Sequence, residues 1–423
     1  MSTPSPQQVI RHNHFDQCDT FFNAAWYGRP SKESDEAAKK AITDAKKGKL
    51  PPDIWRTSIE EAKVQLSILL EQPLDCFTIF HNTTAGVQRI FLRLRDLMSP
   101  HNGTLLISDL EYPGIVSLVD ENWQGRLVMA QVANLVWSGK PALVQDLLER
   151  SISIARPSVI YLSHVARTNG YCLNESLLAY IREVNPKAII VIDGAQAIGN
   201  IYVSRSFLEK VDFYVTSGHK WVSAHQTLGI VYAHERWKLP DPAQSYSMRA
   251  GSGGTGNLAT LRSLPPALKD FNGVLADIAP KEQMRRIEGH NAQLAGQFSI
   301  AMKDLGLTCV GVDSGSSDYE WRWNGLVTIQ NAPERLVDEL TKDGTITALR
   351  SEEWRDQVGG RPRAARFLLK CNPRTGTVTF TNNVDLREKF VPIPAAGCLR
   401  FCFHYYHNMG HVRELVQRIS GLL

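Results

Sequence analysis

The feature of the sequence that most limits its fold is a series of short apolar runs separated by helical segments. The runs occupy residues 104–109, 126–132, 159–163, 188–193, 212–216 and 228–233, and most are continuously apolar rather than alternating. Strands of this kind are covered on both faces. Their alternation with helices is typical of an α/β domain with a mostly parallel sheet. Such sheets bind ligands outside the carboxyl ends of their strands, so the polar residues that follow the runs are the first candidates for chemistry.

The overall composition is that of an ordinary globular chain. The 423 residues include 47 Lys and Arg against 43 Asp and Glu, a small excess that gives no reason to expect nucleic acid or a membrane as partner. Seven cysteines without paired spacing do not form a disulfide framework and indicate a reducing compartment. The first residues lack the pattern of a secretory signal, and no apolar run reaches the ~20 residues of a membrane span. We therefore expect a cytoplasmic protein.

Changes of pattern along the chain predict three parts. We expect an N-terminal arm at residues 1–30, a large domain at 31–285 and a small C-terminal domain at 286–423. Pro265 and Pro266 predict the start of a helix. A long helix is predicted over 281–305, where Ile287, Leu294 and Phe298 share one face. Strand-like runs at 307–312, 324–329, 377–380 and 398–403 and a final helix at 410–422 are typical of a small α+β domain.

Three polar segments that follow apolar runs carry candidate chemistry. Lys220, in Thr216-Ser-Gly-His-Lys-Trp, could act as an amine nucleophile, although a solvated loop lysine is an equal interpretation. Asp193 ends an apolar run, where a carboxylate needs a cation or several donors unless it caps a helix. Thr83 and Thr84 precede a helical run and suit either a phosphate or a simple cap. Together they are the parts that a pyridoxal phosphate enzyme needs.

Two stretches, Val191-Ile-Asp-Gly-Ala-Gln-Ala-Ile-Gly and Ser217-Gly-His-Lys-Trp, resemble those of the class V aminotransferase family, whose members are pyridoxal phosphate enzymes of fold type I. The family includes cysteine desulfurases and isopenicillin-N-epimerase-like proteins, and the resemblance runs from Phe21 to the C-terminus. It implies pyridoxal 5'-phosphate as cofactor, a large α/β domain with a mostly parallel, seven-stranded-type sheet flanked by helices, and a smaller α+β C-terminal domain. It also implies a homodimer with shared active sites.

The implied activity starts from a small-molecule amino acid, which forms an external aldimine and loses its Cα proton. The reaction then ends as an amino transfer or as a β-elimination, for instance by a carbon–sulfur lyase. The shared residues serve these outcomes equally. Epimerisation of an amino acid, or a non-catalytic binding protein with the same fold, stays open as the alternative.

The resemblance also assigns roles to single residues. Lys220 matches the catalytic Schiff-base lysine, Asp193 the partner of the pyridine nitrogen, and Gln196 the donor to the phenolic oxygen of the ring. Arg400 resembles the arginine that clamps the substrate carboxylate, a task that suits a guanidinium because it pairs bidentately. The phosphate is matched by side chains of one subunit and by a threonine of the neighbouring one: Thr83, Thr84, Ser217 and His219, and Thr255.

Other positions depart from the family pattern. Tyr112 stands where desulfurases have the histidine that stacks on the pyridine ring. Arg167 stands where they have an asparagine, and it could either add a second cation to the substrate pocket or form a structural ion pair. Asn23, Ala25 and Trp26 lie where the arm of relatives lines the substrate pocket, with core packing an equal interpretation for Trp26.

The remaining features give weaker indications. A desulfurase needs a loop cysteine shortly before the carboxylate-binding arginine, but Cys371 lies 29 residues before Arg400 and Cys398 is too close, so we do not expect a persulfide mechanism. Cys398, Cys402 and His404 are ligand types for zinc, but Arg400 shares their strand face and would repel a metal, so none is expected. The arginine-rich stretch 350–373 could shape a pocket for an acidic or bulky substrate or form a solvated loop.

Overall fold

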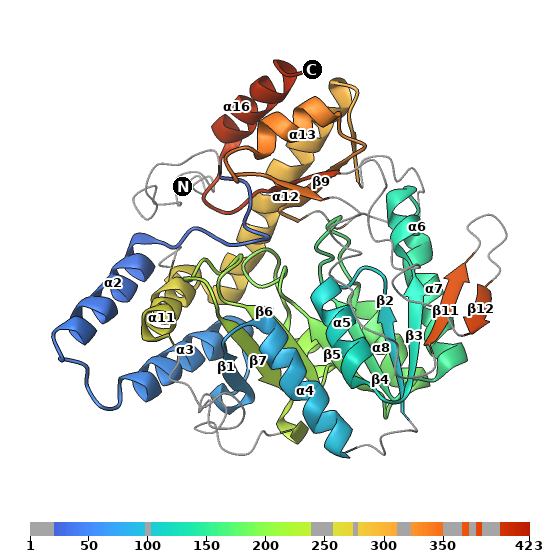
Figure 1. Ribbon diagram of the computed structural model, residues 1–423, viewed down its shortest axis with the longest axis horizontal. Helices are drawn as coiled ribbons and strands as arrows, with labels where there is room; N and C mark the ends of the chain where they lie inside the picture. The colour runs from blue at the N-terminus through green and yellow to red at the C-terminus, as the bar shows by residue number, and fades with distance from the viewer. Residues whose placement is uncertain are drawn as a thin grey trace.

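The computed structural model describes residues 21–97, 103–237, 257–273, 278–310, 322, 324–349, 366–371, 378–382 and 398–423. Figure 1 shows a large sheet in the lower part of the molecule and a small sheet above it. The ends of the described chain lie on the upper part, where the arm that begins at Phe21 packs under the small sheet. Among the described residues no helix is both long enough and apolar enough to cross a bilayer.

In the described part of the chain the large sheet has nine strands, and all but two of them run in the same direction. The two exceptions, β7 and β12, are each paired antiparallel to their neighbours. From one edge to the other the order is β1 (Phe77–Phe80), β7 (Gly229–Ala233), β6 (Phe213–Ser217), β5 (Ile189–Asp193), β4 (Val159–Ser163), β2 (Thr104–Ser108), β3 (Arg126–Gln131), β11 (Arg366–Cys371) and β12 (Val378–Asn382).

Alternate residues of the central strands pack into two separate cores, which explains why the strands are continuously apolar. On one face, α4 (Thr83–Leu97) and α5 (Pro113–Asn122) cover side chains such as Leu105 and Val191. On the other face, α3 (Ile54–Leu70), α7 (Ala142–Ala155), α8 (Glu175–Val184) and α11 (Leu258–Gly273) cover side chains such as Leu106 and Ile190. The predicted parallel α/β architecture is therefore correct, and it directs the strand ends of β2, β4, β5 and β6 to one edge.

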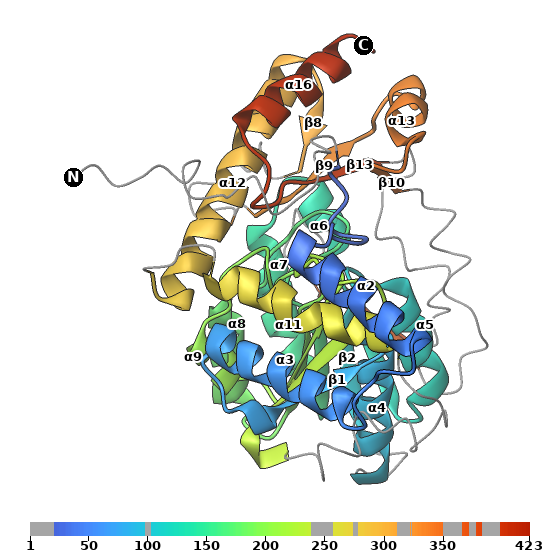
Figure 2. The ribbon, with the colours of Figure 1, turned by 90° about the vertical axis from the view of Figure 1, so that its left-hand side faces the viewer.

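The small sheet is antiparallel and has the order β10 (Thr347–Leu349), β13 (Cys398–Cys402), β9 (Leu326–Gln330) and β8 (Thr308–Cys309). The helices α12 (Pro280–Asp304), α13 (Glu334–Thr341) and α16 (Met409–Ser420) share its core, in which Phe298 and Phe401 are fully buried. Figure 2 shows α12 as a long rod that runs from the large part of the molecule to the small part. The predicted long helix and the predicted final helix are both present.

Two expectations about the C-terminal half were wrong. The run at 377–380 forms β12, but β11 and β12 extend the large sheet beyond β3 instead of joining the small one. Pro265 and Pro266 lie inside α11 rather than at its start. Proline normally disfavours a helix interior, but α11 packs against α2 (Lys32–Lys46) and α3, and this packing outweighs the local preference. The domain limits at 30 and 285 stay a prediction.

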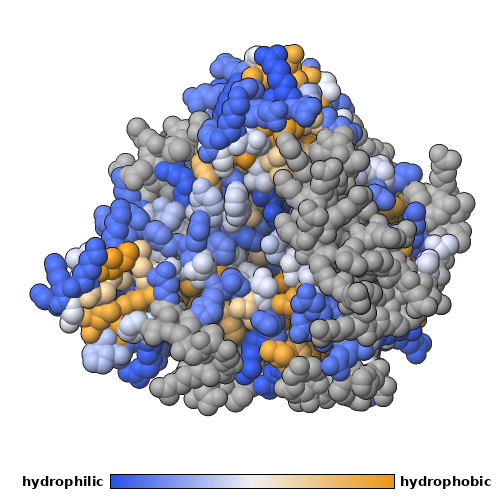
Figure 3. Space-filling view, viewed as in Figure 1, coloured by the Kyte–Doolittle hydropathy of each residue, from blue (hydrophilic) through white to orange (hydrophobic). Residues whose placement is uncertain are grey.

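The outer face of α2 and α3 carries exposed apolar side chains. Ile42 on α2 and Val64 and Ile68 on α3 are each more than two-fifths exposed, at 48%, 44% and 44%. Figure 3 shows an apolar patch on the left of the molecule, where these two helices lie, within a largely hydrophilic surface. The short helices α6 (Ala133–Trp137) and α9 (Arg205–Glu209) and the 3-10 turns Leu74–Cys76 and Glu235–Trp237 complete the described elements.

Candidate active site

The candidate site forms where β5 and β6 end side by side. Asp193 is the last residue of β5, and in the sheet it is paired with Ser163 of β4 and Val215 of β6. Two hydrogen bonds fix the turn that follows. The amide of Gly194 donates to the carbonyl of Val215 at 2.6 Å, and the hydroxyl of Thr216 donates to the carbonyl of Gly194 at 2.8 Å. These bonds hold the loop after β5 against the strand that leads to Lys220.

The Asp193 carboxylate is buried and held by two donors. The Tyr161 hydroxyl donates to its Oδ2 at 2.8 Å, and the Ala195 amide donates to its Oδ1 at 2.9 Å. A carboxylate has about four acceptor sites, so these bonds leave it able to accept another. The carboxylate is therefore fixed in direction and still able to face a cationic ring nitrogen.

Lys220 lies close enough to Asp193 for the two charges to interact. Burial lowers the pKa of the Lys220 amine to about 8; the Asp193 charge raises it, while the charges of Arg167 and Arg400 lower it further. A lysine with this pKa is partly neutral near pH 7, which makes it a competent nucleophile. The structure thus brings together Lys220 and Asp193, the two residues that carry the sequence-based assignment.

The predicted phosphate site lies at the start of α4, beside β6. Asn82 caps the helix by accepting from the Ala85 amide at 2.8 Å, and the Thr83 hydroxyl donates to the Thr216 carbonyl at 3.3 Å. A Cβ on Gly229 would lie 2.3 Å from the Asn82 backbone, so only glycine lets β7 approach the helix start so closely. Thr84 follows directly on the first turn, where backbone amides and the helix dipole favour an anion.

Ser217 and His219, the other predicted phosphate ligands, contact each other. The Ser217 hydroxyl lies 3.0 Å from Nδ1 of His219, and the same nitrogen lies 3.2 Å from the Leu228 carbonyl. Burial, and then the charge of Lys220, lowers the pKa of His219 to about 4. The imidazole is therefore neutral at pH 7 and can offer a phosphate a hydrogen bond but not a charge.

The N-terminal arm packs against the site through its backbone. Gln196 donates from Nε2 to the Ala25 carbonyl at 3.0 Å, and its Oε1 accepts from the Trp221 indole at 2.7 Å. The Gly28 amide donates to the His219 carbonyl at 2.7 Å, and a Cβ at this glycine would collide with the backbone of Lys220. Gln196 therefore ties the arm to the lysine loop, and one N–H of its amide is left for the predicted bond to the cofactor ring.

The arm residues predicted for the substrate pocket behave differently from one another. The amide of Asn23 is buried, where it donates to the Gly344 carbonyl at 3.1 Å and accepts from the Thr347 hydroxyl. The Ala25 amide donates to Sγ of Cys402 at 3.3 Å. Trp26 is 60% exposed. Asn23 and Ala25 thus join the arm to the small sheet, and core packing does not account for Trp26.

Arg400 lies in the middle of β13 and is fully buried. Its Nη1 donates to the Arg167 carbonyl at 3.2 Å, whereas Nε and Nη2 have no hydrogen-bond partner among the described residues. These two nitrogens form the side of a guanidinium that pairs with both oxygens of one carboxylate. A buried cation with this edge unpaired is costly, and an acid group of a ligand would satisfy it.

Tyr112 and Arg167 lie together at the edge of this region. Tyr112 precedes α5, and its side chain is 38% exposed. The Arg167 guanidinium carbon lies 5.1 Å from the centre of the Tyr112 ring, within the range of a cation–π contact. Tyr112 therefore has one ring face against a guanidinium, which leaves only the other for the predicted stacking on a cofactor.

Sequence reasoning missed a buried acid next to these groups. Glu111 accepts from the Ser108 and Ser163 hydroxyls, both at 2.6 Å. Burial raises its pKa to about 8, and the nearby Asp193 charge raises it as well. Glu111 is therefore largely protonated at neutral pH. The sequence could have indicated Glu111, because its two hydrogen-bond donors, Ser108 and Ser163, both lie at the ends of apolar runs.

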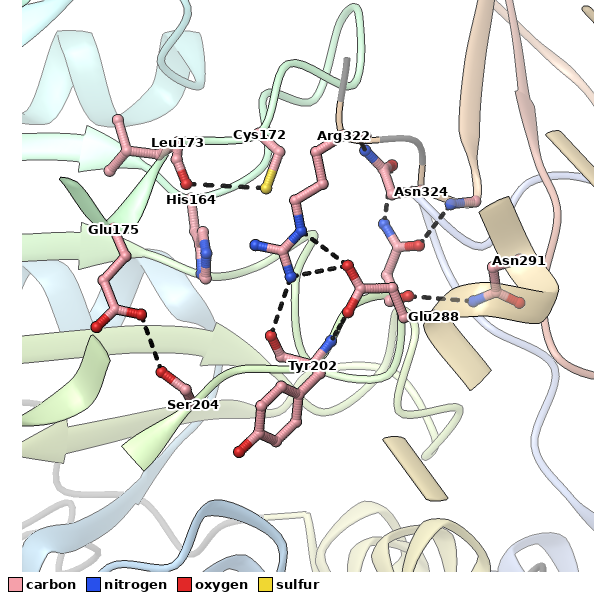
Figure 4. Close-up of polar contacts among 12 residues, drawn as sticks. His164, Cys172, Leu173, Glu175, Tyr202, Ser204, Glu288, Asn291, Arg322 and Asn324 are labelled. Atoms are coloured by element: carbon pink, nitrogen blue, oxygen red, sulfur yellow. Dashed lines mark hydrogen bonds and ion pairs between the residues drawn. The ribbon is translucent and has the colours of Figure 1, made fainter. Parts of the chain in front are cut away.

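Sequence reasoning also missed the polar network that connects the two parts of the molecule (Figure 4). Arg322 donates to the Glu288 carboxylate and to the Tyr202 carbonyl, and Glu288 also accepts from the Tyr202 amide at 2.9 Å. Nearby, Asn200 accepts from the Gly325 amide at 2.7 Å and donates to the Asn324 side chain at 3.2 Å. Since β9 begins at Leu326 and pairs Thr328 with Arg400, this network fixes the arginine relative to the large sheet.

Several predicted features lie outside the described residues. They are Thr255 and most of the arginine-rich stretch 350–373. Within the described residues, no three His, Cys, Asp or Glu side chains are grouped as a metal site would require. His404 lies 2.7 Å from the Trp221 carbonyl through Nε2, so its ring connects the small part of the molecule to the lysine loop.

Solved structures of other proteins share this fold. The fold matches a cystine C–S lyase in complex with its product cysteine persulfide, with a TM-score of 0.66, 16% identity and coverage of 95% of this chain and 97% of the other. It also matches a cysteine desulfurase of Thermococcus onnurineus (TM-score 0.67, 16% identity, 95% and 94% covered) and one of Escherichia coli (0.67, 15%, 100% of both). The C–S lyase has been seen with glycine covalently linked to its pyridoxal phosphate.

The chain accordingly has the fold of these solved structures. Residues 55–245 match the model of the aminotransferase class-V family. Over 202 residues it is 30% identical to isopenicillin N epimerase of Streptomyces clavuligerus, and the alignment spans 45% of the length of each protein. The fold class predicted from the sequence is thereby confirmed, and the match over residues 55–245 agrees with the predicted resemblance to the class V family.

The residues at the edge of the large sheet fit pyridoxal phosphate. A partly neutral lysine, an oriented carboxylate and a capped helix start with two threonines are the donor set that the aldehyde, the pyridine nitrogen and the phosphate require. The unpaired edge of Arg400 provides in addition a place for the carboxylate of an amino acid.

Proposed function

We propose that the protein is a pyridoxal-phosphate enzyme that removes the Cα proton of an α-amino acid. The observation that carries the proposal is that Asp193 and Arg400 lie near Lys220. The charges of both residues shift the pKa of the Lys220 amine. Bound pyridoxal phosphate would supply an electron sink for the negative charge that develops at Cα. In this proposal Asp193 holds a proton on the pyridine nitrogen, Arg400 binds the α-carboxylate, and Lys220 binds the aldehyde and then moves the Cα proton.

The other predicted residues serve binding in this proposal. Thr83, Thr84, Ser217 and His219 hold the phosphate, with Thr255 of a second subunit. Gln196 donates to the phenolic oxygen, and Tyr112 stacks on the ring. Arg167 and Trp26 line the substrate side, while the backbone of the arm at Asn23 and Ala25 keeps that side in place.

The proposed reaction ends as an amino transfer or as a β-elimination; a cystine C–S lyase among the structural matches supports a lyase outcome. The 30% identity to an epimerase favours epimerisation as a second candidate. Purified protein incubated with candidate amino acids distinguishes the three. Pyruvate and ammonia indicate elimination, a keto acid with cofactor amine indicates transamination, and solvent deuterium at Cα without net change indicates epimerisation.

The proposal as a whole is tested by an absorption spectrum of the purified, cofactor-loaded protein. We expect a visible band that an amino acid bleaches and that Lys220→Ala lacks. A band of equal intensity in Lys220→Ala contradicts the assignment, and a band that no amino acid alters supports a non-catalytic binding protein instead.

We also propose a homodimer with shared sites, on the basis of the resemblance around Thr255. Mixing Lys220→Ala with Thr255→Ala subunits should restore activity, because a hybrid dimer contains one site without either change. Mass measurement by light scattering gives the size of the assembly independently. A monomeric mass, or mixtures as inactive as the separate variants, would exclude shared sites.

A further inference from the structure

We propose that Glu111 is a positioning residue, which holds the Tyr112 ring in the place where it stacks on the cofactor. The inference rests on the proposed function, because it explains how one cofactor contact of the same site is kept in place. It gives a task to a buried acid that the proposed reaction does not use.

The Tyr112 side chain is held neither by burial nor by capping. It is 38% exposed, and it occupies the N-cap position of α5, where it makes no capping hydrogen bond within the described helix. Serine, threonine, asparagine and aspartate are preferred at this position, because their oxygens accept from the free amides of the first turn. A tyrosine brings no such bond, so its presence at the N-cap points to a task outside the helix.

Glu111 fixes the backbone directly before this ring. Its side chain is buried, and its carboxyl group accepts from the hydroxyls of Ser108 and Ser163, both at 2.6 Å. Ser108 ends β2 and Ser163 ends β4, and these two strands are neighbours in the sheet. Glu111 therefore ties the turn after β2 to the end of the adjacent strand, and Tyr112 follows on a fixed backbone.

A second buried acid holds the other side of the same turn. Oδ1 of Asp109 accepts from the amides of Val132 and Ala133, both at 2.8 Å. The Asp109 amide donates to the Ala130 carbonyl at 3.1 Å. Ala130 lies in β3, which is on the other side of β2 from β4. The turn at 108–112 is thus bound at both neighbouring strands, so its backbone has little freedom to move the ring.

Two further contacts determine where the ring lies. A Cβ on Gly114 would come within 2.7 Å of Cε1 of Tyr112, so the ring lies against the first turn of α5 and only glycine leaves space for it. The Arg167 guanidinium carbon lies over the ring, 5.1 Å from its centre. The ring is therefore oriented although it is exposed. An aromatic ring that is already oriented loses less entropy when a flat heterocycle stacks on it.

The proposal is tested with pyridoxamine 5'-phosphate, which lacks the aldehyde and so binds without a bond to Lys220. Its dissociation constant is measured by calorimetry on the cofactor-free protein. Loss of an aromatic side chain that stacks on a flat heterocycle weakens binding about tenfold or more, and we expect this of Tyr112→Ala. Glu111→Ala should cause a loss of similar size. Added to Tyr112→Ala, it should change the constant by less than about twofold, because Glu111 acts through the ring.

Three more variants make the test specific. The atoms nearest to the methyl group of Gly114→Ala all belong to the Tyr112 ring, so this variant should weaken binding in the wild type and have no effect in Tyr112→Ala. Glu111→Gln can still bond to both serine hydroxyls and should bind the probe within about twofold of the wild type. Ile152→Ala is the matched control, because it removes buried apolar contacts near the end of α7. It should lower the urea midpoint and leave the dissociation constant unchanged.

The inference is overturned if Glu111→Ala binds the probe as tightly as the wild type, or if it causes the same loss with and without the Tyr112 ring. The second result would show that Glu111 acts on the site by another route. If Glu111→Ala does not fold, Ser163→Ala takes its place, because it removes only the tie to β4. Its loss should also vanish in Tyr112→Ala, and an equal loss in both backgrounds overturns the inference.

The outcome is separable from the proposed function, because the probe forms no bond to Lys220. If the protein shows the Lys220-dependent visible band but Tyr112→Ala binds the probe like the wild type, the enzyme assignment stands and the positioning role is wrong. If Lys220→Ala keeps the band of the wild type, the proposed function has failed, whatever the probe shows.

Discussion

Replacing Arg400 should make the ligand-free protein more stable and the enzyme almost inactive. In Arg400→Met, an apolar side chain of similar length takes the place of a fully buried cation with two unpaired nitrogens. An unpaired buried donor costs about 1–3 kcal/mol, and the bond to the Arg167 carbonyl that is lost contributes about 1 kcal/mol. Removing both unpaired nitrogens at the loss of that one bond should therefore raise the free energy of unfolding by about 1–5 kcal/mol. Two charge-assisted bonds to substrate, each worth about 1.5–3 kcal/mol, predict a 10²–10⁴-fold loss in kcat/KM.

The two effects are measured on the same samples, by urea denaturation of the cofactor-free protein and by steady-state kinetics with the substrate found in the amino-acid screen. Arg400→Lys is the matched control, because it keeps the buried charge and removes the planar fork. It should lose most of the activity without gaining stability. A less stable Arg400→Met protein, or one that keeps its kcat/KM, would show that Arg400 is a structural residue and refute the reasoning.

Three further predictions follow from the charges at the sheet edge. The rate at which cofactor-free protein binds pyridoxal phosphate should rise with pH through about 8, because burial lowers the pKa of Lys220 and only the neutral amine attacks the aldehyde. Stopped-flow absorbance measures this rate, and a midpoint near the ordinary pKa of lysine would contradict the prediction. Asp193→Asn keeps the shape of the side chain and can still accept from the Ala195 amide, while its NH2 group can only donate, to the Tyr161 hydroxyl, so the fold should be retained. We expect this variant to lose about a hundredfold or more in kcat, whereas Tyr161→Phe should lose about tenfold; equal losses would remove the special role of the carboxylate. Burial raises the pKa of Glu111 to about 8, so the folded protein binds this proton more tightly than the unfolded chain does, and Glu111 destabilises the fold progressively as the pH rises from about 4.5 to 8. Glu111→Gln should therefore match the wild type in urea denaturation at pH 5 and exceed it at pH 9, and a constant difference would show that the acid is not held neutral.

Local pattern was enough to predict the large sheet and the residues at its edge. Strands buried on both faces are apolar throughout, so runs such as 188–192 can be recognised in the sequence. The polar residue that follows this run, Asp193, must then lie at the carboxyl end of the strand. Lys220 follows β6 for the same reason. The candidate site was predictable to this extent because parallel strands bring their ends together whatever their order along the chain.

Long-range pairing could not be predicted in the same way. Nothing local in residues 366–382 distinguishes a strand of the small sheet from one that pairs with β3, since that choice depends on contacts with residues more than two hundred positions away. The helix start predicted at Pro265 and Pro266 was wrong for a related reason. Packing of α11 on α2 and α3 outweighs the preference of proline for a helix start. Hydrogen bonds such as Asn200 to Gly325, which position Arg400, likewise join segments that only the folded chain brings together.

The hairpin of β11 and β12 has a practical consequence for anyone who wishes to cut this protein into pieces. Ending the chain at residue 285 would remove β11, the neighbour of β3. It would leave β3, whose Leu127, Val128 and Met129 are fully buried in the whole protein, as an unpaired apolar edge strand that other chains could pair with. We expect such a fragment to aggregate, so residues 1–285 should not be stable as an independent domain.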